Sequence, residues 1–476
     1  MNPQLDEQSS QCPEPTDRPD LWPWSAHRKD DGELMLGGIG VSDIAKQYGT
    51  PIYLMDMDDL EGRATVWASA MAEDFWPGYG LSGGSAYYAA KAMMSVKIAQ
   101  TVTSCGMGID TASLGELRCA LAAGVDPNLI GLHGNNKPES AIVEAIQAGE
   151  SGIGRIVVDS FGEIDLIDKI ANKLGRSAKV MVRVTTGVHA GGHEFIATAH
   201  EDQKFGLSLH TGAAKAAVTE ISQRSHLKFI GLHAHIGSQI YDLEAFARSA
   251  EKLLGLVADL AESGIETEEV DLGGGYAIAY TGDDKLAPSQ QEVTTKLAEA
   301  VRTTCENLDI PVPRVSIEPG RSVVGPTTIT LYEVGTVKDV PIGEGRNRLY
   351  VSVNGGMSDN IRPALYQANY TATLANRTSS TPLVPARVVG GHCESGDIIV
   401  RNVLLPADVK AGDLLAVPCT GAYGHSMASN YNMFPRPGTL GIKANEAHWL
   451  VRPETCADIF SRDPYYRSEE AEAKES

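Results

Sequence analysis

The stretch Gly84-Ser-Ala-Tyr-Tyr-Ala-Ala-Lys-Ala92 predicts a buried strand that ends at a single lysine. Residues 86–89 are small or aromatic, and a helix-like segment begins directly after Lys91. An ammonium group at the end of a buried strand is unfavourable unless it is paired, used chemically, or carried to solvent by its flexible stem. Lys91 is therefore a candidate functional residue, and the rest of the chain decides between a functional lysine and a surface lysine.

The strand-then-helix pattern around Lys91 continues to about residue 320. Eight apolar, β-branched runs alternate with seven helix-like segments, which predicts a parallel α/β sheet covered on both faces. Eight strands favour a closed (β/α)8 TIM barrel over an open sheet. The expected strands are residues 86–90, 108–110, 129–133, 155–158, 179–184, 229–233, 269–272 and 314–317. The expected helices are residues 95–105, 114–123, 138–148, 161–174, 211–222, 243–263 and 290–308. Residues 187–205 form an insertion that contains glycine and histidine.

Beyond Arg321 the helical periodicity stops and short strand-like runs predict a C-terminal all-β domain. These runs are residues 328–334, 349–353, 386–389, 397–400 and 414–417. An early strand at residues 52–55 is expected to join the same domain. The predicted division of the chain is a flexible N-terminal lead-in at 1–30, a segment joining the β domain at 31–57, the barrel at 58–325, the β domain at 326–465 and a charged tail at 466–476.

Composition and charge narrow the class of protein. The chain has 476 residues and a formal net charge of -21, which argues against nucleic acid or an anionic membrane as a partner. No apolar run approaches the roughly 20 residues that span a bilayer, and the N-terminus lacks the features of a signal peptide. Seven cysteines, an odd number without a CxxC pair, are typical of reduced thiols. We therefore expect a soluble cytoplasmic protein.

Every expected barrel strand ends in polar residues or glycine, and the chemistry of a barrel lies at those ends. In order, the ends carry Lys91; Asp110 and Ser113; His133 and Asn135; Asp159 and Ser160; Arg183; His233 and His235; Gly273, Gly274 and Gly275; and Glu318 and Arg321. Ser113, with Glu116 three residues later, fits a helix capping box equally well. The eight polar ends together predict a single site.

A lysine, a glycine-rich turn and a carboxylate in one barrel mouth match the requirements of pyridoxal 5'-phosphate. Lysine forms a Schiff base, glycine N–H groups bind a phosphate, and Glu318 can pair with the ring nitrogen. His235 can stack on the ring and Ser238 can bind the phosphate, although a triple glycine also occurs in simple turns and His235 can be a core histidine. Alternate residues on a strand point to opposite faces, so His233 and His235 are not expected to chelate a metal. A second metal hypothesis, with His189, His193 and Glu194, stays open.

The chain resembles fold-type III pyridoxal-phosphate decarboxylases, and within them the diaminopimelate decarboxylase branch, especially its actinobacterial members. The resemblance covers roughly residues 37–452. Its motifs are YYAAKA (87–92), HGNNK (133–137), EFIATAHEDQKFGLS (194–208), GLHAHIGSQI (231–240), DLGGGYAIAY (271–280), EPGR (318–321), NGGMSDNIRPALY (354–366), HCESGDI (392–398) and GAYGHSMASNYN (421–432).

The resemblance implies a role for each matching residue. Lys91 is expected to carry pyridoxal 5'-phosphate, His235 to stack on it and Glu318 to hold its ring nitrogen. Cys393 is expected to donate a proton to the α-carbon, and Glu394 to pair with the distal ammonium of the substrate. Both would come from the partner protomer of a homodimer. The residues expected to line the cofactor and its phosphate are Ser238, Gly273, Gly274, Gly275, Pro319, Gly320, Arg321 and Tyr423. Those expected to bind the substrate are Arg321, Arg362, Tyr366, Glu394 and Tyr423.

The implied reaction is removal of the carboxylate at the D-configured centre of meso-2,6-diaminopimelate, which gives L-lysine and carbon dioxide as the last step of lysine biosynthesis. The alternatives are a decarboxylase of ornithine, arginine or lysine, a racemase-like enzyme, and a catalytically inactive regulator with the same fold. Two arginines, Arg321 and Arg362, favour a substrate with a second carboxylate. Three residues depart from the family pattern: Met93, Gln203 and Asn354 stand where asparagine, serine and aspartate are usual.

Overall fold

The computed structural model describes residues 9–188, 204–343 and 345–466. The chain divides into two units, each built from more than one segment. The barrel unit comprises Glu61–Ala277 and Ala287–Val323, and the β unit comprises Met1–Leu60, Ile278–Leu286 and Val324–Ser476. Among the described residues, no helix combines the length and apolar character needed to cross a bilayer.

The barrel unit is a closed ring of parallel strands, as predicted. Pairing between β9 and β10 closes the ring, which otherwise follows the order β10-β12-β13-β14-β6-β7-β8-β9. Most strand residues are buried, as expected for strands covered on both faces. The strands are β6 (Gly84–Ala89), β7 (Gly108–Thr111), β8 (Ile130–Leu132), β9 (Arg155–Val158), β10 (Ala178–Thr185), β12 (Leu227–His233), β13 (Glu269–Asp271) and β14 (Arg314–Ile317). The short β11 (Leu207–Ser208) pairs with the end of β10.

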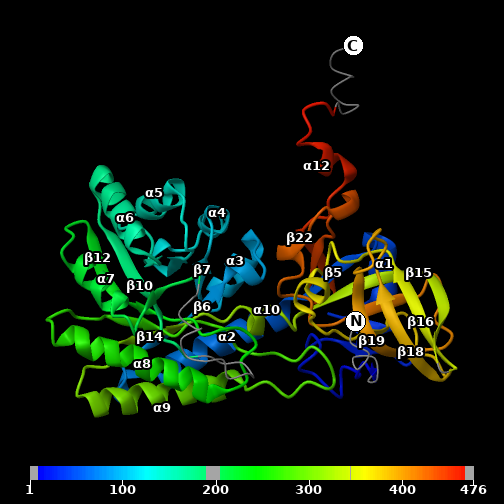
Figure 1. The fold of residues 1–476 in the computed structure, drawn as a ribbon. Coiled ribbons are helices and arrows are strands. Elements are labelled where there is room, and N and C mark those ends of the chain that lie inside the picture. The colour runs from blue at the N-terminus through cyan, green and yellow to red at the C-terminus, as the bar shows by residue number, and fades with distance from the viewer. Residues whose placement is uncertain (1–8, 189–203, 344, 467–476) are drawn as a thin grey trace. The chain divides into compact units, whose positions relative to one another are not determined.

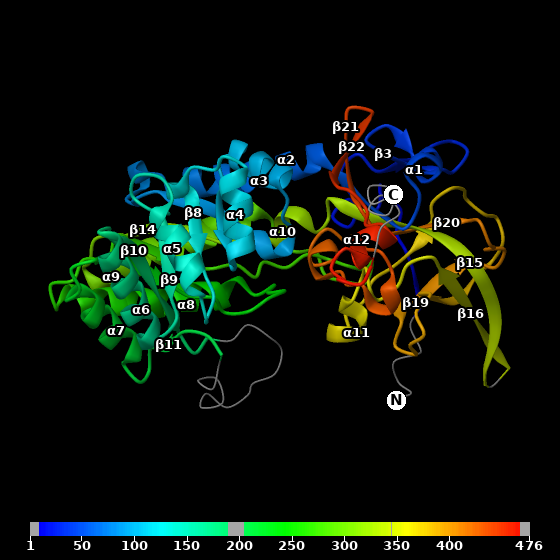
Figure 2. The same cartoon turned by 90° about the horizontal axis from the view of Figure 1, so that it is seen from above.

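Helices surround the strands on the outside of the ring (Figures 1 and 2). They are α2 (Met57–Asp74), α3 (Val96–Ser104), α4 (Leu114–Ala122), α5 (Glu139–Gln147), α6 (Phe161–Leu174), α7 (Ala213–Ser222), α8 (Leu243–Ala261), α9 (Gln290–Leu308) and the short α10 (Arg321–Val324). The seven expected helices are present, and α2 was not predicted. Its start belongs to the β unit and the rest to the barrel unit, so it carries the chain from one to the other.

The β unit is built on a ten-stranded sheet. Its main order is β1-β19-β18-β16-β15-β5-β21-β22, and β17 and β20 pair beside β15. The bounds are β1 (Ser10–Gln11), β5 (Ile52–Asp56), β15 (Thr328–Gly343), β16 (Arg346–Val353), β17 (Thr373–Leu374), β18 (Leu383–Val389), β19 (Ile398–Pro406), β20 (Leu414–Val417), β21 (Thr439–Lys443) and β22 (Glu446–Val451). The early strand predicted at residues 52–55 does join this domain, as β5 between β15 and β21.

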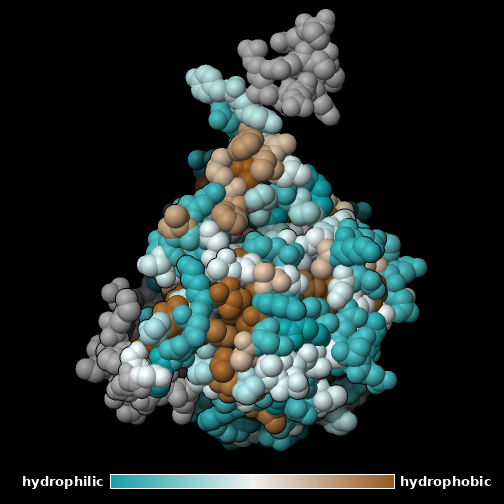
Figure 3. Space-filling model, turned by 90° about the vertical axis from the view of Figure 1, so that its right-hand side faces the viewer, coloured by the Kyte–Doolittle hydropathy of each residue, from teal (hydrophilic) through white to brown (hydrophobic). Residues whose placement is uncertain are grey.

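Smaller elements complete the β unit. A three-stranded sheet contains β2 (His27–Arg28), β3 (Leu34–Leu36) and β4 (Ile39–Gly40), and the helices are α1 (Val41–Tyr48), α11 (Arg362–Tyr366) and α12 (Cys456–Phe460). On the face drawn in Figure 3, apolar side chains gather in a band between polar and charged ones.

The predicted flexible lead-in, residues 1–30, is wrong for the part from residue 9 onward. Leu21 and Trp22 are fully buried in the core of the β unit, and Ser10 and Gln11 pair with β19. The indole N–H of Trp22 donates a hydrogen bond to the Pro13 carbonyl, 3.0 Å away. The polar, proline-rich composition hid these few apolar residues, whose burial anchors the segment.

A second unpredicted feature is that Ile278–Leu286 leaves the barrel sequence and belongs to the β unit. Ile278, Ala279 and Tyr280 are buried in the same core as Trp22. The thiol of Cys419 donates to the carbonyl oxygens of Leu21 and Ala279 at 3.1 and 3.2 Å, which ties both segments together. Most of the predicted insertion at 187–205, with His189, His193, Glu194 and Gln203, and nearly all of the predicted charged tail lie outside the described residues.

Candidate active site

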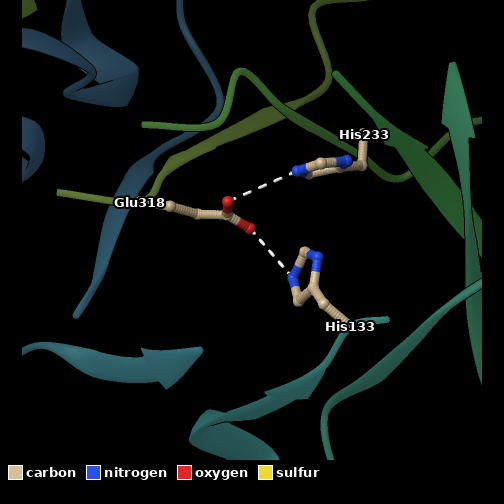
Figure 4. Close-up of side chains that lie close together, drawn as sticks. All are labelled: His133, His233 and Glu318. Carbon is tan, nitrogen blue, oxygen red and sulfur yellow. Dashed lines mark hydrogen bonds and ion pairs between the residues drawn. The ribbon is translucent and has the colours of Figure 1, made fainter. Parts of the chain in front are cut away.

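Four titratable side chains from four different strands meet at the carboxyl ends of the barrel strands. The carboxylate of Glu318, which follows β14, lies between two imidazoles (Figure 4). Its Oε1 is 3.0 Å from Nε2 of His133, and its Oε2 is 3.3 Å from Nε2 of His233. The same Nε2 of His133 lies 2.6 Å from Oδ1 of Asp110. All four side chains are buried, so these charges interact with little screening by solvent.

The two histidines of this cluster have opposite protonation tendencies. Burial disfavours a charged ring, but Asp110 and Glu318 outweigh it and raise the pKa of His133 to about 9. For His233, burial dominates and lowers the pKa to about 3. Burial alone would raise the pKa of Glu318, yet the adjacent histidines hold that pKa well below its usual range. At pH 7 the cluster therefore contains an ionised Glu318, a cationic His133 and a neutral His233.

His133, His233 and Glu318 have ligand atoms within 4.8 Å of one another, which is also compatible with a metal site. A protonated His133 can balance the carboxylates as a metal ion would, because its Nε2 lies within ion-pair distance of two carboxylate oxygens. The cation of the cluster is then the imidazolium itself, and a metal is not required to balance the acids.

The glycine-rich turn after β13 is packed too tightly for side chains. A Cβ at Gly274 would lie 2.1 Å from the Glu318 carbonyl oxygen, and a Cβ at Gly275 would lie 2.2 Å from that of Gly237. Gly273 N–H donates to Asp271 at 2.8 Å, and Gly274 N–H donates to Nδ1 of His235 at 3.3 Å. His235 must therefore be neutral with its proton on Nε2, in agreement with the lowering of its pKa by burial and by Lys91.

Lys91 lies in a turn, Ala90–Ala92, directly after β6, and its side chain is exposed rather than buried. After burial, the positive charge of Lys91 contributes to the lowering of the His235 pKa. Burial and Glu318 raise the pKa of Asp110, and Lys91 offsets part of that rise, so Lys91 lies at the same end of the barrel. Nearby, Nη2 of Arg321 donates to Oγ of Ser238 at 2.9 Å. The structure thus brings together the predicted barrel residues Lys91, His235, Ser238, Gly273, Gly274, Gly275, Glu318 and Arg321 at the ends of the strands.

Other polar strand ends have structural roles. Oγ of Ser113 caps α4 by accepting the Glu116 N–H at 3.2 Å. Arg183 lies 3.9 Å from Asp159, whose Oδ1 also accepts the Gly206 N–H. These residues stabilise the loops around the site rather than the Glu318 cluster.

The remaining predicted site residues lie in the β unit. Arg362, at the start of α11, is buried between two tyrosines: its guanidinium donates to the Tyr370 hydroxyl and its Cζ lies 4.7 Å from the centre of the Tyr280 ring. Tyr366, at the other end of α11, is 61% exposed. Tyr423 has a φ of 62°, a left-handed conformation that is uncommon for a bulky residue and frequent at functional sites.

Cys393 and Glu394 occupy an exposed loop whose neighbours are held firmly. The backbone and Nδ1 of His392 contact the Asp397 carboxylate at 2.8 and 3.1 Å, and the His392 ring stacks on Phe434 at 4.3 Å. Cys393 N–H donates to Oδ1 of Asn432 at 3.1 Å. These contacts hold the backbone at His392 and Cys393, while the Cys393 thiol and the Glu394 carboxylate lie in an exposed part of the loop.

Comparison with known proteins identifies the family. Residues 63–325 match the pyridoxal-dependent decarboxylase, pyridoxal binding domain family. The diaminopimelate decarboxylase of Mycobacterium tuberculosis is 45% identical over 448 residues, which cover 93% of this chain and 97% of that protein. The chain belongs to the diaminopimelate decarboxylase family. It is a carboxy-lyase that depends on pyridoxal phosphate.

Other relatives agree with this identification. The diaminopimelate decarboxylase of Bacillus subtilis is 41% identical over 92% of this chain and 97% of its own length. The crystal structure of diaminopimelate decarboxylase from M. jannaschii in complex with L-lysine has a TM-score of 0.85 and 30% identity, and covers 93% of this chain and 98% of that one. Similarity to diaminopimelate decarboxylases therefore extends over both units of the chain.

The barrel residues fit the cofactor of a diaminopimelate decarboxylase. Of the three glycine N–H groups, those of Gly273 and Gly274 donate within the chain to Asp271 and His235. A Cβ at any of the three would collide with a backbone carbonyl oxygen, so the turn admits only glycine. An ionised carboxylate is the partner that a protonated pyridine nitrogen requires, and Glu318 supplies one. Lys91 supplies the exposed amine; among the described residues none accepts a hydrogen bond from it.

One of the departures from the diaminopimelate decarboxylase pattern, Asn354, has a structural account. Met93 is buried, but its hydrogen bond from the Tyr88 hydroxyl, at 2.6 Å, is made by the backbone carbonyl and does not explain the side chain. The Asn354 side chain uses both its functions: Oδ1 accepts the Glu333 N–H at 3.0 Å, and Nδ2 donates to the carbonyl oxygen of Thr50 at 2.9 Å and to its hydroxyl at 2.8 Å. An aspartate here would lack the donor for Thr50.

Asn354→Asp is therefore expected to destabilise the β unit by about 1 kcal/mol, because a carboxylate would face the Thr50 carbonyl without a proton to donate. Asn354→Ala is the matched variant, since it removes the hydrogen bonds without adding charge. Thermal unfolding at neutral pH should rank Asn354→Asp below Asn354→Ala, and the gap should close under acidic conditions where the new carboxyl is protonated. Equal stability of Asn354→Asp and the wild type would contradict the role assigned to the amide.

Sequence reasoning missed several residues that contact the predicted site residues. Asp110 and His133 were recognised as polar strand ends, but their contact with Glu318 was not predicted. Tyr280 and Tyr370, which hold Arg362, were not predicted at all. The available signal was position: each of Asp110, His133 and Glu318 ends its own strand, and the ends of parallel strands meet in a barrel.

Proposed function

We propose that this diaminopimelate decarboxylase homologue removes the carboxylate at the D-configured centre of meso-2,6-diaminopimelate and releases L-lysine and carbon dioxide. The observation that carries the proposal is the buried, ionised Glu318 at the barrel end that also bears Lys91 and the Gly273–Gly275 turn. The family likeness over nearly the whole chain supports the substrate, because relatives with this name match at 40–45% identity.

In this proposal the barrel unit holds the cofactor. When bound, pyridoxal phosphate accepts the electron pair that is left when carbon dioxide departs from the substrate. Lys91 attaches it covalently, and Glu318 keeps a negative charge beside the ring nitrogen. The neutral His235 covers the ring. Ser238, Gly275, Pro319, Gly320 and Arg321 bound the phosphate and substrate region.

The β unit is proposed to supply substrate recognition and the proton. Arg362 and Tyr366, with Arg321 from the barrel, bind the distal carboxylate of diaminopimelate, and Glu394 pairs with the distal ammonium. Cys393 donates the proton that replaces the lost carboxylate on the α-carbon, and Tyr423 contacts cofactor and substrate. The contacts of His392 with Asp397 and of the Cys393 N–H with Asn432 support this role, because a proton donor must be held within reach of the reacting carbon.

The proposed substrate is tested by measuring carbon dioxide release from meso-diaminopimelate, L-lysine and L-ornithine. A clear preference for meso-diaminopimelate is expected, because an arginine held between two tyrosines has no partner in a substrate with a single carboxylate. Preference for L-lysine or L-ornithine would instead assign the chain to the decarboxylases of basic amino acids.

Arg362→Lys is expected to lower kcat/KM for meso-diaminopimelate about 10- to 100-fold, mainly through KM. Lysine keeps the positive charge but loses the planar fork, and a charged hydrogen bond of this kind contributes about 1.5–3 kcal/mol. Arg387→Lys is the control: Arg387 also packs on a tyrosine of the β unit, Tyr350, at 5.6 Å, but has no proposed role in binding. Unchanged kinetics in Arg362→Lys would remove Arg362 from the substrate site.

The proposed assembly is a homodimer in which Cys393 and Glu394 complete the site of the partner. Exposed apolar side chains on the β unit support a surface that a second copy covers. Leu365 and Tyr366 on α11 are 56% and 61% exposed, and Tyr431, which stacks on His392, and the nearby Met433 are 42% and 56% exposed.

A complementation experiment tests the shared site. Lys91→Ala and Cys393→Ala should each be nearly inactive alone. After unfolding and refolding as a mixture, random pairing should restore about one quarter of wild-type activity, because half of the dimers are hybrids with one intact site. No recovery, in a mixture shown by mass to contain hybrids, would place Cys393 and Lys91 in the site of one protomer.

We propose the cytoplasm as the compartment of this reaction. All seven cysteines lie in the described part of the chain, and none forms a disulfide. Cys393 and Cys456 are exposed, and such thiols persist in a reducing compartment. Oxidising conditions should inactivate the enzyme through Cys393, and a reductant should restore it.

A further inference from the structure

His133 pairs with both Glu318 and Asp110. Among the described residues, charged or titratable groups surround the cluster on several elements. They are Lys91 after β6, Asp110 on β7, Glu116 on α4, Arg155 on β9, Arg183 on β10, His233 on β12, His235 beyond it, Asp271 on β13, Tyr276 beyond it and Glu318 after β14. Three of these groups are cations by nature: Lys91, Arg155 and Arg183.

Both arginines are engaged elsewhere. The guanidinium of Arg155 binds Glu269 at 2.6 Å and Asp271 at 2.7 Å, and Arg183 is 3.9 Å from Asp159. Lys91 is the proposed attachment point of the cofactor, so its nitrogen is committed to that bond and no ion pair joins it to Glu318 among the described residues. The group that touches Glu318 and can hold a lasting positive charge is therefore His133.

The position of His133 also fixes the geometry of Glu318. Its Nε2 lies 3.0 Å from Oε1 of Glu318 and 2.6 Å from Oδ1 of Asp110, so both carboxylates are paired with the same nitrogen. The rings of His133 and His233 meet edge to face, 4.9 Å apart at 73°. Each oxygen of Glu318 thus has its own imidazole, and the carboxylate cannot rotate without losing one of them.

We infer that His133 is a positioning residue: clamped between Asp110 and Glu318 as a cation, it keeps Glu318 ionised and turned toward the ring nitrogen of pyridoxal phosphate. This inference rests on the proposed role of Glu318. Asp110 acts indirectly, by keeping His133 charged. His233 is a neutral hydrogen-bond partner of Oε2 of Glu318. The protonation of the cofactor ring is then set by an Asp110–His133–Glu318 chain rather than by Glu318 alone.

The Asp110–His133–Glu318 contacts predict how protonation of the site changes with pH. Below about pH 9 His133 is protonated, and Glu318 stays ionised beside it. As the pH rises through that value, His133 loses its proton, and the cation that lowers the pKa of Glu318 is gone. Glu318 then becomes more basic, so the bound ring is expected to give up its proton more readily. Asp110→Asn removes one of the two anions that favour the imidazolium, so it should move the titration of His133 to lower pH.

The test uses the loaded full-length enzyme and nuclear magnetic resonance of nitrogen. With pyridoxal phosphate labelled at its ring nitrogen, His133→Gln should shift the ring signal toward that of an unprotonated pyridine, although glutamine can still donate a neutral hydrogen bond. His226→Gln is the control, because His226 lies outside the cluster, 3.6 Å from Asp168. We expect kcat of His133→Gln to fall about 10- to 100-fold, by analogy with the loss of residues that orient metal ligands in other enzymes, while KM changes little.

A ring signal identical in His133→Gln and the wild type would overturn the inference. Should His133→Gln fail to fold, pH titration of the histidine resonances of the wild type and of Asp110→Asn decides. The titration midpoint of His133 must lie well above the usual value of about 6.5 in the wild type, and it must be lower in Asp110→Asn. A wild-type midpoint at or below 6.5 also overturns it. These signals are independent of turnover, so an enzyme that does not act on meso-diaminopimelate would refute the proposed function without touching His133.

Discussion

Lys91→Ala is expected to abolish turnover, with a loss on the order of 10⁴-fold or more in kcat, because the amine that attaches the cofactor is gone. Lys91→Arg should be equally inactive, since a guanidinium keeps the charge but does not form the covalent bond. After reduction of the loaded wild type with borohydride, peptide mass analysis should find the cofactor on the peptide that contains Lys91 and on no other.

Lys137 is the natural comparison for Lys91. Its Nζ donates to the Glu163 carboxylate at 2.9 Å and to the carbonyl oxygens of Gly134 and Val157 at 2.7 and 2.5 Å, so its amine is fully occupied. Lys91 ends exposed in a short turn beside the site. A reduced adduct on Lys137, or activity retained in Lys91→Ala, would refute the assignment of the attachment residue.

Arg155→Met is expected to destabilise the barrel by about 3–5 kcal/mol, because it leaves buried carboxylates without their cation. The Arg155 side chain is 2% exposed, its Nη1 also contacts Oγ of Ser316 at 3.0 Å, and its Cζ lies 3.6 Å from the centre of the Tyr87 ring. Burial and Glu318 raise the pKa of Asp271 to about 7 even beside this arginine.

The pH dependence of the Arg155→Met effect follows from the sign of that shift. A carboxyl with a folded-state pKa above its unfolded value, about 3.9, favours the folded state most when protonated. Its contribution is therefore lost as the pH rises from about 4 to 7, and removal of Arg155 should enlarge the loss. Chemical denaturation should show a larger difference between Arg155→Met and the wild type at pH 8 than at pH 5.

Arg224→Met is the matched control for Arg155→Met. Arg224 contacts three carboxylates, those of Asp165, Asp168 and Glu220, but its side chain is 31% exposed. Solvent screening should make the loss of stability in Arg224→Met much smaller than that in Arg155→Met. An equal loss in both variants would show that the number of ion pairs, and not their burial, determines the stability of the barrel.

The strands and most helices of the barrel were predictable because their signals are local. Residues 155–158 and 314–317 form strands with the predicted bounds, since a continuous apolar run reports burial directly. Arg155, in the first of these strands, shows what a local sequence pattern does not predict. Arg155 opens such a run, and its burial depends on Glu269 and Asp271, which lie more than a hundred positions later in the chain.

The candidate site likewise contains residues that could be predicted from the sequence and contacts that could not. Lys91 and Glu318 were predicted because each carries its chemistry alone at the end of a strand. His133 has its meaning only through Asp110 and Glu318, and no spacing in the sequence reports those contacts. Helix α2 is a different kind of omission: Met57, Leu60, Ala64, Trp67 and Met71 repeat with helical spacing and are all buried, so the pattern was available.

The route of the chain between its two units restricts how this protein can be rebuilt or recombined. Because Ile278–Leu286 contributes to the β core from within the barrel sequence, an excised fragment of residues 61–323 would carry an apolar loop with nothing to bury it. A hybrid that takes its β unit from a relative must therefore exchange three separate stretches together. Gene fusions with a single junction should yield insoluble product, whereas hybrids that also exchange the nine-residue loop should fold.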